Sequence, residues 1–460
     1  MLFNTIEFML FFPIVTLLYY LLPHNWRWLM LLIASCVFYM WFIPKYIFIL
    51  LVTIVIDYSA GLLMEKWKEE PFRRRLCLIV SIVSTCMVLF IFKYLNFCSE
   101  NLVALAQKLG FNHPSHVLNI ALPIGLSFHT FQSLSYVIEV YRGTQKAERH
   151  FGYYALYVMF YPQLVTGPIE RPNNLLRQLH ENHTLQYDNI AKGLRLILFG
   201  LFLKMVVADN LGTMVDKVYA SPHNFSRLDI LLSMVLYSFQ IYGDFFGYSS
   251  IALGCALVMG ISLIDNFRSP YLSGSIKEFW RRWHISLSSW FRDYLYIPLG
   301  GNRVSFPRWM INTMIVFVVC GIWHGANWTF MLWGAAYGIL LIIEKIITDK
   351  TGRKILLHIS TFIIVTLLWS IFRAPTFSAL KDLYSALLHG GGNEHLSADL
   401  SVWIALVMFI ILDIVLRNTR FDVWCMRLKT PLRWFIYAVM IFAIIAFSSV
   451  EQYPFIYFQF

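Results

Sequence analysis

Apolar blocks separated by short polar connections follow one another along almost the whole chain of 460 residues. Many blocks are about 17 to 25 residues long, the length that an α-helix needs to cross a hydrocarbon core of about 30 Å. Only 14% of the residues are charged, against about 25% in an average soluble domain. A helix satisfies its own backbone hydrogen bonds inside lipid. The blocks therefore predict an all-α polytopic membrane protein.

Not every block fits a full crossing. Several are short or interrupted by glycine and proline, which favours re-entrant or interfacial helices. We expect about 11 transmembrane helices, with separate helices at 228–245 and 248–264. No repeat, low-complexity tract or linker divides the chain. A single membrane domain is therefore expected over 1–460, with N-terminal helices in 1–115, a core in 116–350 and C-terminal helices in 351–460.

The positive charge of the chain gathers in short loops. The formal net charge is +11, which fits contact with anionic lipid headgroups better than contact with nucleic acid. The loop 65–75 and the connection 141–150 are both rich in Lys and Arg, and two expected crossings separate them. The positive-inside rule places both loops in the cytoplasm. Counting back three crossings from 65–75 predicts an N-terminus outside the cell.

Several kinds of site are disfavoured by the motifs that the chain lacks. The seven cysteines form no CxxC pair, and no histidine lies beside a carboxylate cluster, so we expect neither disulfides nor a metal site. There is no phosphate-binding glycine loop, no HExxH and no GxSxG. The first apolar block lacks the basic start and the small-residue cleavage site of a signal peptide, so we expect it to be the first spanning helix.

The segment 273–297 carries too many charges to cross lipid cheaply. At about 100° per residue, its tryptophans share one face, and Lys277, Arg281 and Arg292 share another. His284 lies on the seam between the two faces. We expect one amphipathic helix that lies at a membrane interface or caps an internal cavity. A peripheral helix with aromatic anchors is an equally good interpretation.

His324 lies inside an apolar run from Trp309 to Ile347 that is too long for one ordinary spanning helix. The natural break is Gly325–Asn327, which would place His324 near a helix end beside Trp323 and Asn327. An ionisable residue at membrane depth is a functional candidate. The alternative is a neutral histidine that bonds a backbone carbonyl freed by the break.

His284 is the second candidate, because a neutral imidazole can act as a base and then as an acid. Nearby Arg281 would disfavour its charged form. Taken alone, His284 fits a solvated interfacial histidine better than a catalytic one.

Two polar segments lie between apolar blocks. In QIYGDFFGYSSIALG (240–254), Gln240 and Asp244 share a helical face. A buried Asp244 needs a partner, for which Arg281 or Arg282 would serve, and structural pairing is the better interpretation. In FYPQLVTGPIERPNNLLRQL (160–179), prolines forbid a continuous helix. We expect a bent segment ending in a loop, with Glu170 at the interface.

The segments RRWHISLSSWFRDYLYIPLGGNR (281–303) and GIWHGANWTF (321–330) together resemble the signature of the membrane-bound O-acyltransferases. The segments 123–143, 160–172 and 240–254 are similar to the same family. The likeness is to its bacterial branch, that of alginate O-acetylation and of D-alanyl transfer to teichoic acid. It covers roughly 1–350 strongly and the rest by pattern, including the FIYFQF end.

The resemblance implies a ring of membrane helices around a thinned centre with a tunnel between the two membrane faces. It assigns the catalytic histidine to His324 and the second signature histidine to His284. The donor would be an acyl thioester on the cytoplasmic side, with acetyl-CoA expected and no bound cofactor. The acyl group would leave on the outer face, often through a partner with a serine hydrolase-like fold. One departure is Ser250, where the family pattern GYSD reads GYSS.

Thioester acyl transfer to a hydroxyl needs a base and donors for the developing oxyanion. His324 is the candidate base or a transient acyl carrier. Asn327, Trp323 or the amides freed at the break are candidates for oxyanion or substrate support. Gln240, Asp244, Arg281 and Arg282 are structural or channel-lining polar residues.

Three function classes remain open. The first is an acyltransferase of a bacterial inner membrane that moves acetyl groups for O-acetylation of an extracytoplasmic polysaccharide, with D-alanyl transfer from a carrier protein as the alternative substrate. The second is a proton-coupled transporter with histidine relays. The third is a scaffold that recruits a polymer-modifying enzyme.

Overall fold

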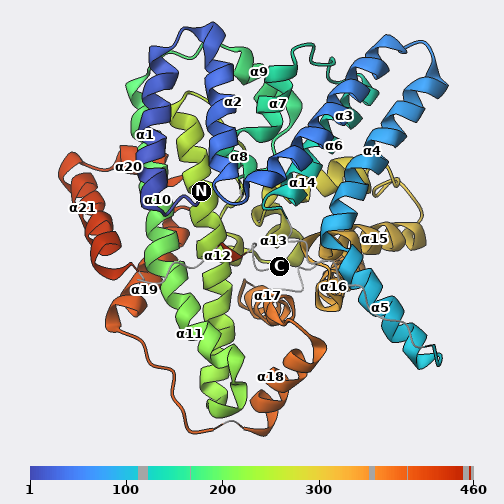
Figure 1. The fold of residues 1–460 in the computed structure, drawn as a ribbon. Coiled ribbons are helices and arrows are strands. Elements are labelled where there is room, and N and C mark those ends of the chain that lie inside the picture. The colour runs from blue at the N-terminus through green and yellow to red at the C-terminus, as the bar shows by residue number, and fades with distance from the viewer. Residues whose placement is uncertain (112–122, 166, 352–357, 391, 449–454, 457–460) are drawn as a thin grey trace. The chain divides into compact units, whose positions relative to one another are not determined.

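The fold comes from a computed structural model, which describes the chain except for residues 112–122, 166, 352–357, 391, 449–454 and 457–460 (Figure 1). The described residues form helices and loops, with an isolated β-bridge between Phe225 and Glu394. The prediction of an all-α chain is confirmed. Parts of the expected helices at 117–141 and 354–373, and most of the FIYFQF end, lie outside the described residues.

Helices long and apolar enough to cross a membrane confirm a polytopic membrane protein. Six such helices occur in the described part of the chain, and the shorter apolar helices α1, α17 and α19 accompany them. A ring of about 11 crossings stays a prediction. The six are Pro44–Lys66, Pro71–Lys93, Arg227–Val258, Phe306–His324, Trp328–Asp349 and Thr430–Phe447.

The chain folds into two compact units. The first contains Met1–Asn189 with Ala256–Ile264, and the second contains Ile190–Cys255 with Asp265–Phe460. The partition expected from the motifs, at 115 and 350, stays a prediction.

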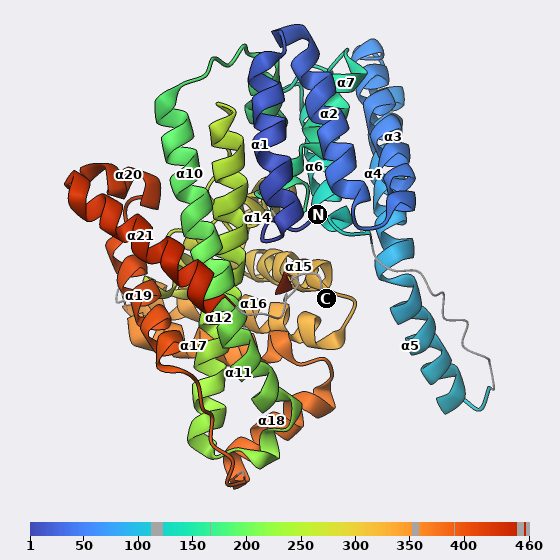
Figure 2. The ribbon, with the colours of Figure 1, turned by 60° about the vertical axis from the view of Figure 1, so that its left-hand side comes forward.

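The first unit is a helical cluster in which α3, α4 and α6 pack against one another (Figure 2). Polar residues between the apolar blocks cap its helices. Thr5, for example, caps α1 by accepting a hydrogen bond from the Phe8 amide. The bend expected at 160–179 is confirmed, but the segment ends in the helix Pro172–His180 and not in the expected loop. The helices are α1 (Ile6–Leu21), α2 (His24–Met40), α3 (Ile47–Lys66), α4 (Pro71–Lys93), α5 (Leu95–Lys108), α6 (Leu126–Arg142), α7 (Phe151–Met159), α8 (Tyr161–Leu164) and α9 (Pro172–His180).

The second unit contains both candidate histidines. Its longest helix is α12, and α15 and α16 form a closely packed hairpin (Figure 1). The helices are α10 (Tyr187–Leu201), a π-helical turn (Phe202–Ala208), α11 (Asp209–Ala220), α12 (Arg227–Val258), α13 (Ile276–Arg282), α14 (Ile285–Phe291), α15 (Phe306–His324), α16 (Trp328–Thr351), α17 (His358–Arg373), α18 (Phe377–His389), α19 (Leu400–Val415), α20 (Phe421–Arg427) and α21 (Thr430–Phe447).

The expectation of two helices at 228–245 and 248–264 is wrong, because α12 continues through 32 residues. Gly247, which lies between the two blocks, allows close helix packing and does not interrupt the helix. A Cβ atom on Gly247 would come within 2.8 Å of the Gly200 carbonyl oxygen in α10. Glycine therefore lets two helix backbones approach closely here, and the helix itself is not interrupted.

The hairpin α15–α16 positions His324. A Cβ atom on Gly321 would lie 2.2 Å from the Phe330 carbonyl oxygen, and one on Gly334 would lie 2.2 Å from that of Phe317. These two glycines allow the two helix backbones to approach. The predicted break at Gly325–Asn327 is confirmed, since α15 ends at His324 and α16 begins at Trp328.

Candidate active site

His324 is the last residue of α15, and the backbone turns extended at Gly325. Its side chain is buried, with only 5% of the residue exposed. The rings of Trp323, Trp333 and Phe372 surround the imidazole, with centroid distances of 4.9, 5.1 and 5.2 Å. His324 therefore lies at a helix end in an aromatic, largely dry setting, as its position in the sequence predicts.

Asn327 maintains the break beside His324. Its carbonyl oxygen accepts a hydrogen bond from the Thr329 amide at 3.1 Å, which caps the start of α16. Its side-chain amide donates to the Pro375 carbonyl oxygen at 2.5 Å. Both ends of the Asn327 side chain are thus engaged in holding the turn.

The segment around His284 differs from the single amphipathic helix expected over 273–297, and that expectation is wrong. The chain forms α13, breaks at His284, forms α14 and continues as a π-helical turn over Arg292–Tyr296. His284 itself adopts a left-handed backbone with φ of 43°. Few residues other than glycine adopt that conformation, although histidine, Asn and Asp are enriched there. The break aims His284 inward, where none of its surface is exposed.

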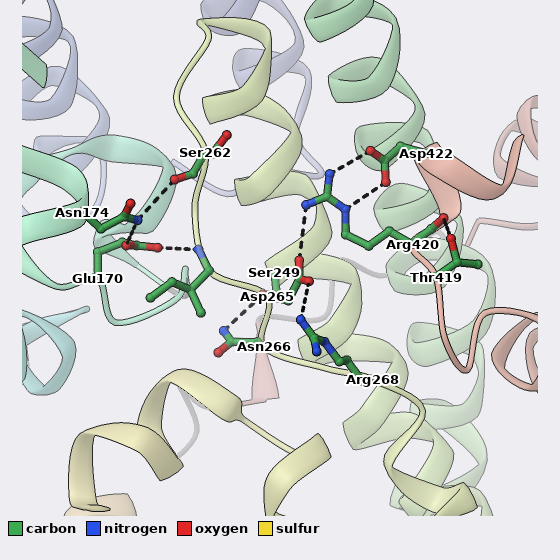
Figure 3. Close-up of polar contacts among 11 residues, drawn as sticks. Glu170, Asn174, Ser249, Ser262, Asp265, Asn266, Arg268, Thr419, Arg420 and Asp422 are labelled. Atoms are coloured by element: carbon green, nitrogen blue, oxygen red, sulfur yellow. Dashed lines mark hydrogen bonds and ion pairs between the residues drawn. The ribbon is translucent and has the colours of Figure 1, made fainter. Parts of the chain in front are cut away.

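Asn266 holds the break at His284 by bonding the start of α14. Its side-chain oxygen accepts from the Ser286 hydroxyl at 2.6 Å and from the Ser286 amide at 3.3 Å. Its backbone oxygen accepts from the Ile285 amide at 3.0 Å. Its side-chain nitrogen donates to the Ser249 hydroxyl in α12 at 3.1 Å (Figure 3). Tertiary hydrogen bonds thus fix a turn that the local sequence does not require.

Both candidate histidines lie near the same aromatic ring, that of Trp323. The ring of Trp323 lies 4.9 Å from the His324 ring and 6.3 Å from the His284 ring. Phe245 of α12 packs edge to face on His284 at 4.6 Å. Burial lowers the pKa of His284 to about 3, so its imidazole is neutral at physiological pH. The structure therefore brings two residues that lie 40 positions apart in the chain to the same tryptophan, Trp323.

Asp244 is buried and paired, but its expected partner was wrong. Lys204, in the π-helical turn after α10, binds Asp244 at 2.7 Å and Asp209 at 2.7 Å. The second Asp244 oxygen accepts from the Ile456 amide at 2.7 Å. Arg282 instead binds Glu278, at 3.0 Å. Lys204 follows α10 and Asp244 lies in α12, so the spacing of charges along one helix does not predict that they pair.

Arg281 and Arg282 line a cavity of about 900 Å³ within the second unit. Six cationic side chains face four carboxylates there: Arg268, Lys277, Arg281, Arg282, Arg417 and Arg420 against Asp265, Glu278, Glu344 and Asp413. Arg420 binds Asp422 at 2.8 Å and Asp265 at 3.4 Å (Figure 3). Within the described part of the chain, Lys277, Arg281 and Arg417 have no carboxylate partner. The cavity therefore has cations available for an anionic ligand.

The wall of this cavity reaches the His284 segment. Asn266 and Ser249, which hold the break, both line it, and so does Ser250. A second cavity of about 810 Å³ shares Lys277 and Arg281 with the first and extends along more apolar residues. Ile285, next to His284, and Cys320, one helical turn before His324, line this second cavity. Gln240 is buried in α12 and lines neither.

Glu170 was expected at an interface, and that expectation is wrong. It is fully buried in the first unit, where the Ile264 amide donates to it at 2.5 Å and the Asn174 side chain at 2.7 Å (Figure 3). Burial raises the pKa of Glu170 to about 7. The local sequence alone predicts an interfacial position. The fold of the proline-rich turn buries Glu170 instead.

Sequence reasoning missed Asn266 and Lys204. Asn266 lies in a short loop without a pattern, although asparagine at such a turn signals side-chain bonding to backbone. Lys204 lies inside an apolar block of the sequence, and a charge in such a block could have been singled out as a candidate at membrane depth. Among the residues that the structure describes, no group of histidines, cysteines and carboxylates suits a metal ion.

Fold and site together define a polytopic helical membrane protein with two buried histidines and a cationic cavity. The family model of the membrane-bound O-acyltransferases matches residues 82–369. The chain belongs to this family and is an acyltransferase.

The chain is similar to three bacterial proteins that represent different acceptors. It is 39% identical over 387 residues to a "Probable alginate O-acetylase AlgI" of Azotobacter vinelandii, covering 83% of this chain and 77% of that protein. It is 35% identical over 445 residues to a "Peptidoglycan O-acetyltransferase" of Helicobacter pylori, covering 87% and 82%. A "Teichoic acid D-alanyltransferase" of Bacillus subtilis is 29% identical over 254 residues, covering 53% and 63%.

Proposed function

We propose that the protein transfers acetyl groups from a thioester donor for O-acetylation of an extracytoplasmic polysaccharide. The single observation that carries this proposal is the pair of buried histidines near the Trp323 ring, with a cationic cavity whose wall includes Asn266, the residue that holds the His284 break. The O-acetylating relatives also align over most of the chain, whereas the D-alanyl-transferring relative aligns over about half of it.

His324 is proposed as the base of the reaction. A neutral imidazole takes the proton of the acceptor hydroxyl as its oxygen attacks the thioester carbonyl. The tetrahedral intermediate then collapses, the carbon–sulfur bond breaks, and the imidazolium returns the proton to the thiolate. The aromatic surroundings of His324 support this role, because they shield the imidazole from bulk water. A role as a transient acyl carrier is the alternative for the same residue.

His284 is proposed as the second residue of the site, oriented by its left-handed backbone and by Asn266. It is kept neutral by burial, so one ring nitrogen can donate a hydrogen bond while the other accepts one. Trp323 is proposed to hold both imidazoles in place and to line the path of the acyl group. Asn327 supports the reaction by fixing the break, and the backbone amides at that break are the candidates for oxyanion stabilisation.

The donor is proposed to be acetyl-CoA, held by its phosphates in the cationic cavity. Lys277, Arg281 and Arg417 supply charges that are free to pair with phosphate. The more apolar second cavity, which reaches Ile285 and Cys320, leads toward the histidines and suits the thioester arm.

The chain is further proposed to form a ring of about 11 helices around a central tunnel, in a bacterial inner membrane with the N-terminus outside. The segments 116–350 would form the core. On the outer face, a partner with a serine hydrolase-like fold would receive the acyl group. The basic loops at 65–75 and 141–150 support the orientation.

Labelled acetyl-CoA added to the purified protein in lipid vesicles tests the proposal. We expect thioester cleavage or label transfer with the wild-type protein and with His389→Ala, an exposed control, and none with His324→Ala. Label movement only from a D-alanyl carrier protein would identify the alternative donor. Wild-type transfer by a folded, inserted His324→Ala protein would contradict both roles of His324. Neither cleavage nor transfer by the wild-type protein with any donor would favour a transporter or a scaffold.

A further inference from the structure

A buried polar column runs through three helices of the first unit. The helices α3, α4 and α6 each contribute two polar residues four positions apart, which places each pair on one helix face. All six residues are at most 1% exposed. They are Thr53 and Asp57 in α3, Ser81 and Thr85 in α4, and His129 and Ser133 in α6.

Asp57 is the only carboxylate of this column, and it lies near the middle of the spanning helix α3. The Ser81 hydroxyl donates to its Oδ1 at 2.5 Å, and the Thr85 hydroxyl donates at 3.0 Å to Oδ1 and 3.1 Å to Oδ2. Hydroxyl groups that converge as donors on both oxygens suit an ionised, acceptor-only carboxylate.

The negative charge of Asp57 lacks a basic partner within the described residues, as no Lys, Arg or His forms an ion pair with it. The His129 imidazole is bonded to the Thr53 hydroxyl instead, at 2.6 Å. An ionised carboxylate at membrane depth is costly unless a cation compensates it. Within the part of the chain that the structure describes, no basic side chain supplies the positive charge that would compensate an ionised Asp57.

Two more hydroxyl groups lie beside Asp57, and the lone pairs of their oxygens can bind a ligand. The Ser133 hydroxyl lies next to the Asp57 carboxyl, and the Tyr154 hydroxyl of α7 lies near both. Neither Ser133 nor Tyr154 has any exposed surface, and neither hydroxyl makes a well-aligned hydrogen bond within the described residues. Buried polar atoms usually find partners, so these oxygens point to a ligand.

We propose that Asp57, Ser133 and Tyr154 bind a sodium ion, with Ser81 and Thr85 completing the oxygen-lined site. The charge of one carboxylate matches a monovalent cation, whereas divalent cations use several carboxylates. The hard oxygen ligands, without thiolate or imidazole, favour sodium over a transition metal. A proton would satisfy the carboxyl alone and would leave the Ser133 and Tyr154 oxygens unmatched. The ion joins α3, α4, α6 and α7.

The sodium site is independent of the proposed acyl transfer, because all its residues belong to the first unit and neither histidine of the second unit takes part. Failure of one proposal therefore leaves the other standing.

The experiment measures the melting temperature of the purified full-length protein in detergent, in sodium, potassium or choline chloride at equal ionic strength. Ligand that binds only the folded state raises stability with its concentration. We expect sodium alone to raise the melting temperature along a saturating curve. Asp57→Asn should abolish the rise, and Ser133→Ala or Tyr154→Phe should raise the sodium concentration at half-effect roughly fivefold to tenfold.

Thr130→Val is the matched control, because the buried Thr130 hydroxyl donates to the Leu126 carbonyl of its own helix at 2.9 Å and is not among the groups that hydrogen-bond Asp57. It should keep the wild-type sodium response. If Asp57→Asn does not fold, the Ser133 and Tyr154 variants still decide. Equal effects of the three salts on the wild-type protein, an unchanged response in both of those variants, or a stability that follows pH and not sodium would each overturn the proposal.

Discussion

The segments that carry the two histidines break in different ways. At His324 the chain ends a helix at Gly325 and caps the next one with Asn327, using residues that favour such a turn locally. At His284 no glycine or proline interrupts the helix, and the break depends on Asn266 from another part of the chain. The local sequence predicts the break at His324, whereas tertiary hydrogen bonds hold the break at His284.

The difference predicts unequal consequences for activity. His324→Ala should lower acyl transfer by about 10²- to 10⁴-fold, the range for loss of a general base, without changing the fold, because the break beside it does not depend on the imidazole. The comparison with His389→Ala in a vesicle assay checks this. A loss of less than about tenfold in a correctly inserted protein would remove His324 from the chemistry.

The buried carboxyl group of Glu170, which accepts a hydrogen bond from the Ile264 amide, gives a pH test. The pKa of Glu170 is raised to about 7 in the folded protein, above about 4.3 for a free side chain. The folded state thus binds the proton more tightly, so stability is highest below pH of about 4.5, falls as the pH rises to about 7, and is flat above that, by an amount on the order of 3 kcal/mol.

Melting curves between pH 5 and 8 measure this fall, and Glu170→Gln should flatten it. The exposed Glu181, bound to Arg177 at 3.6 Å, provides the control Glu181→Gln, which should keep the wild-type slope. A slope that survives in Glu170→Gln would assign the titration to another group.

The break at His284 should fail when its tertiary support is removed. Asn266→Ala leaves the Ser286 and Ser249 groups without their partner, at a cost of about 1–3 kcal/mol, and releases His284. We expect lower stability together with an acyl-transfer loss of about tenfold or more. The exposed Asn224→Ala is the control for both readouts. Loss of stability with full activity would show that Asn266 does not orient the site.

The smallest expected effect concerns the left-handed backbone of His284. Asparagine tolerates that conformation and alanine does not, so His284→Ala should be less stable than His284→Asn by about 1 kcal/mol. Chemical or thermal unfolding of the two variants measures the difference. Equal stabilities would mean that the backbone relaxes and that the turn is not strained.

The sequence predicted those features that depend on local pattern. Block length gave the helical membrane class, and the Gly325–Asn327 break placed His324 at a helix end. It failed where partners come from elsewhere in the chain: Lys204 replaces the arginines expected for Asp244, and Asn266 breaks the helix expected at His284. Gly247 looked like a break between blocks because its packing against Gly200 is invisible in the sequence.

The most direct test of the paired site is a double-mutant cycle on acetyl transfer in vesicles, with His324→Ala, His284→Asn and the combined variant. Residues that act as a unit lose activity in a strongly non-additive way. If both histidines serve one reaction around Trp323, the combined variant should lose no more activity than His324→Ala alone. Losses that multiply, as for independent residues, would contradict the paired site.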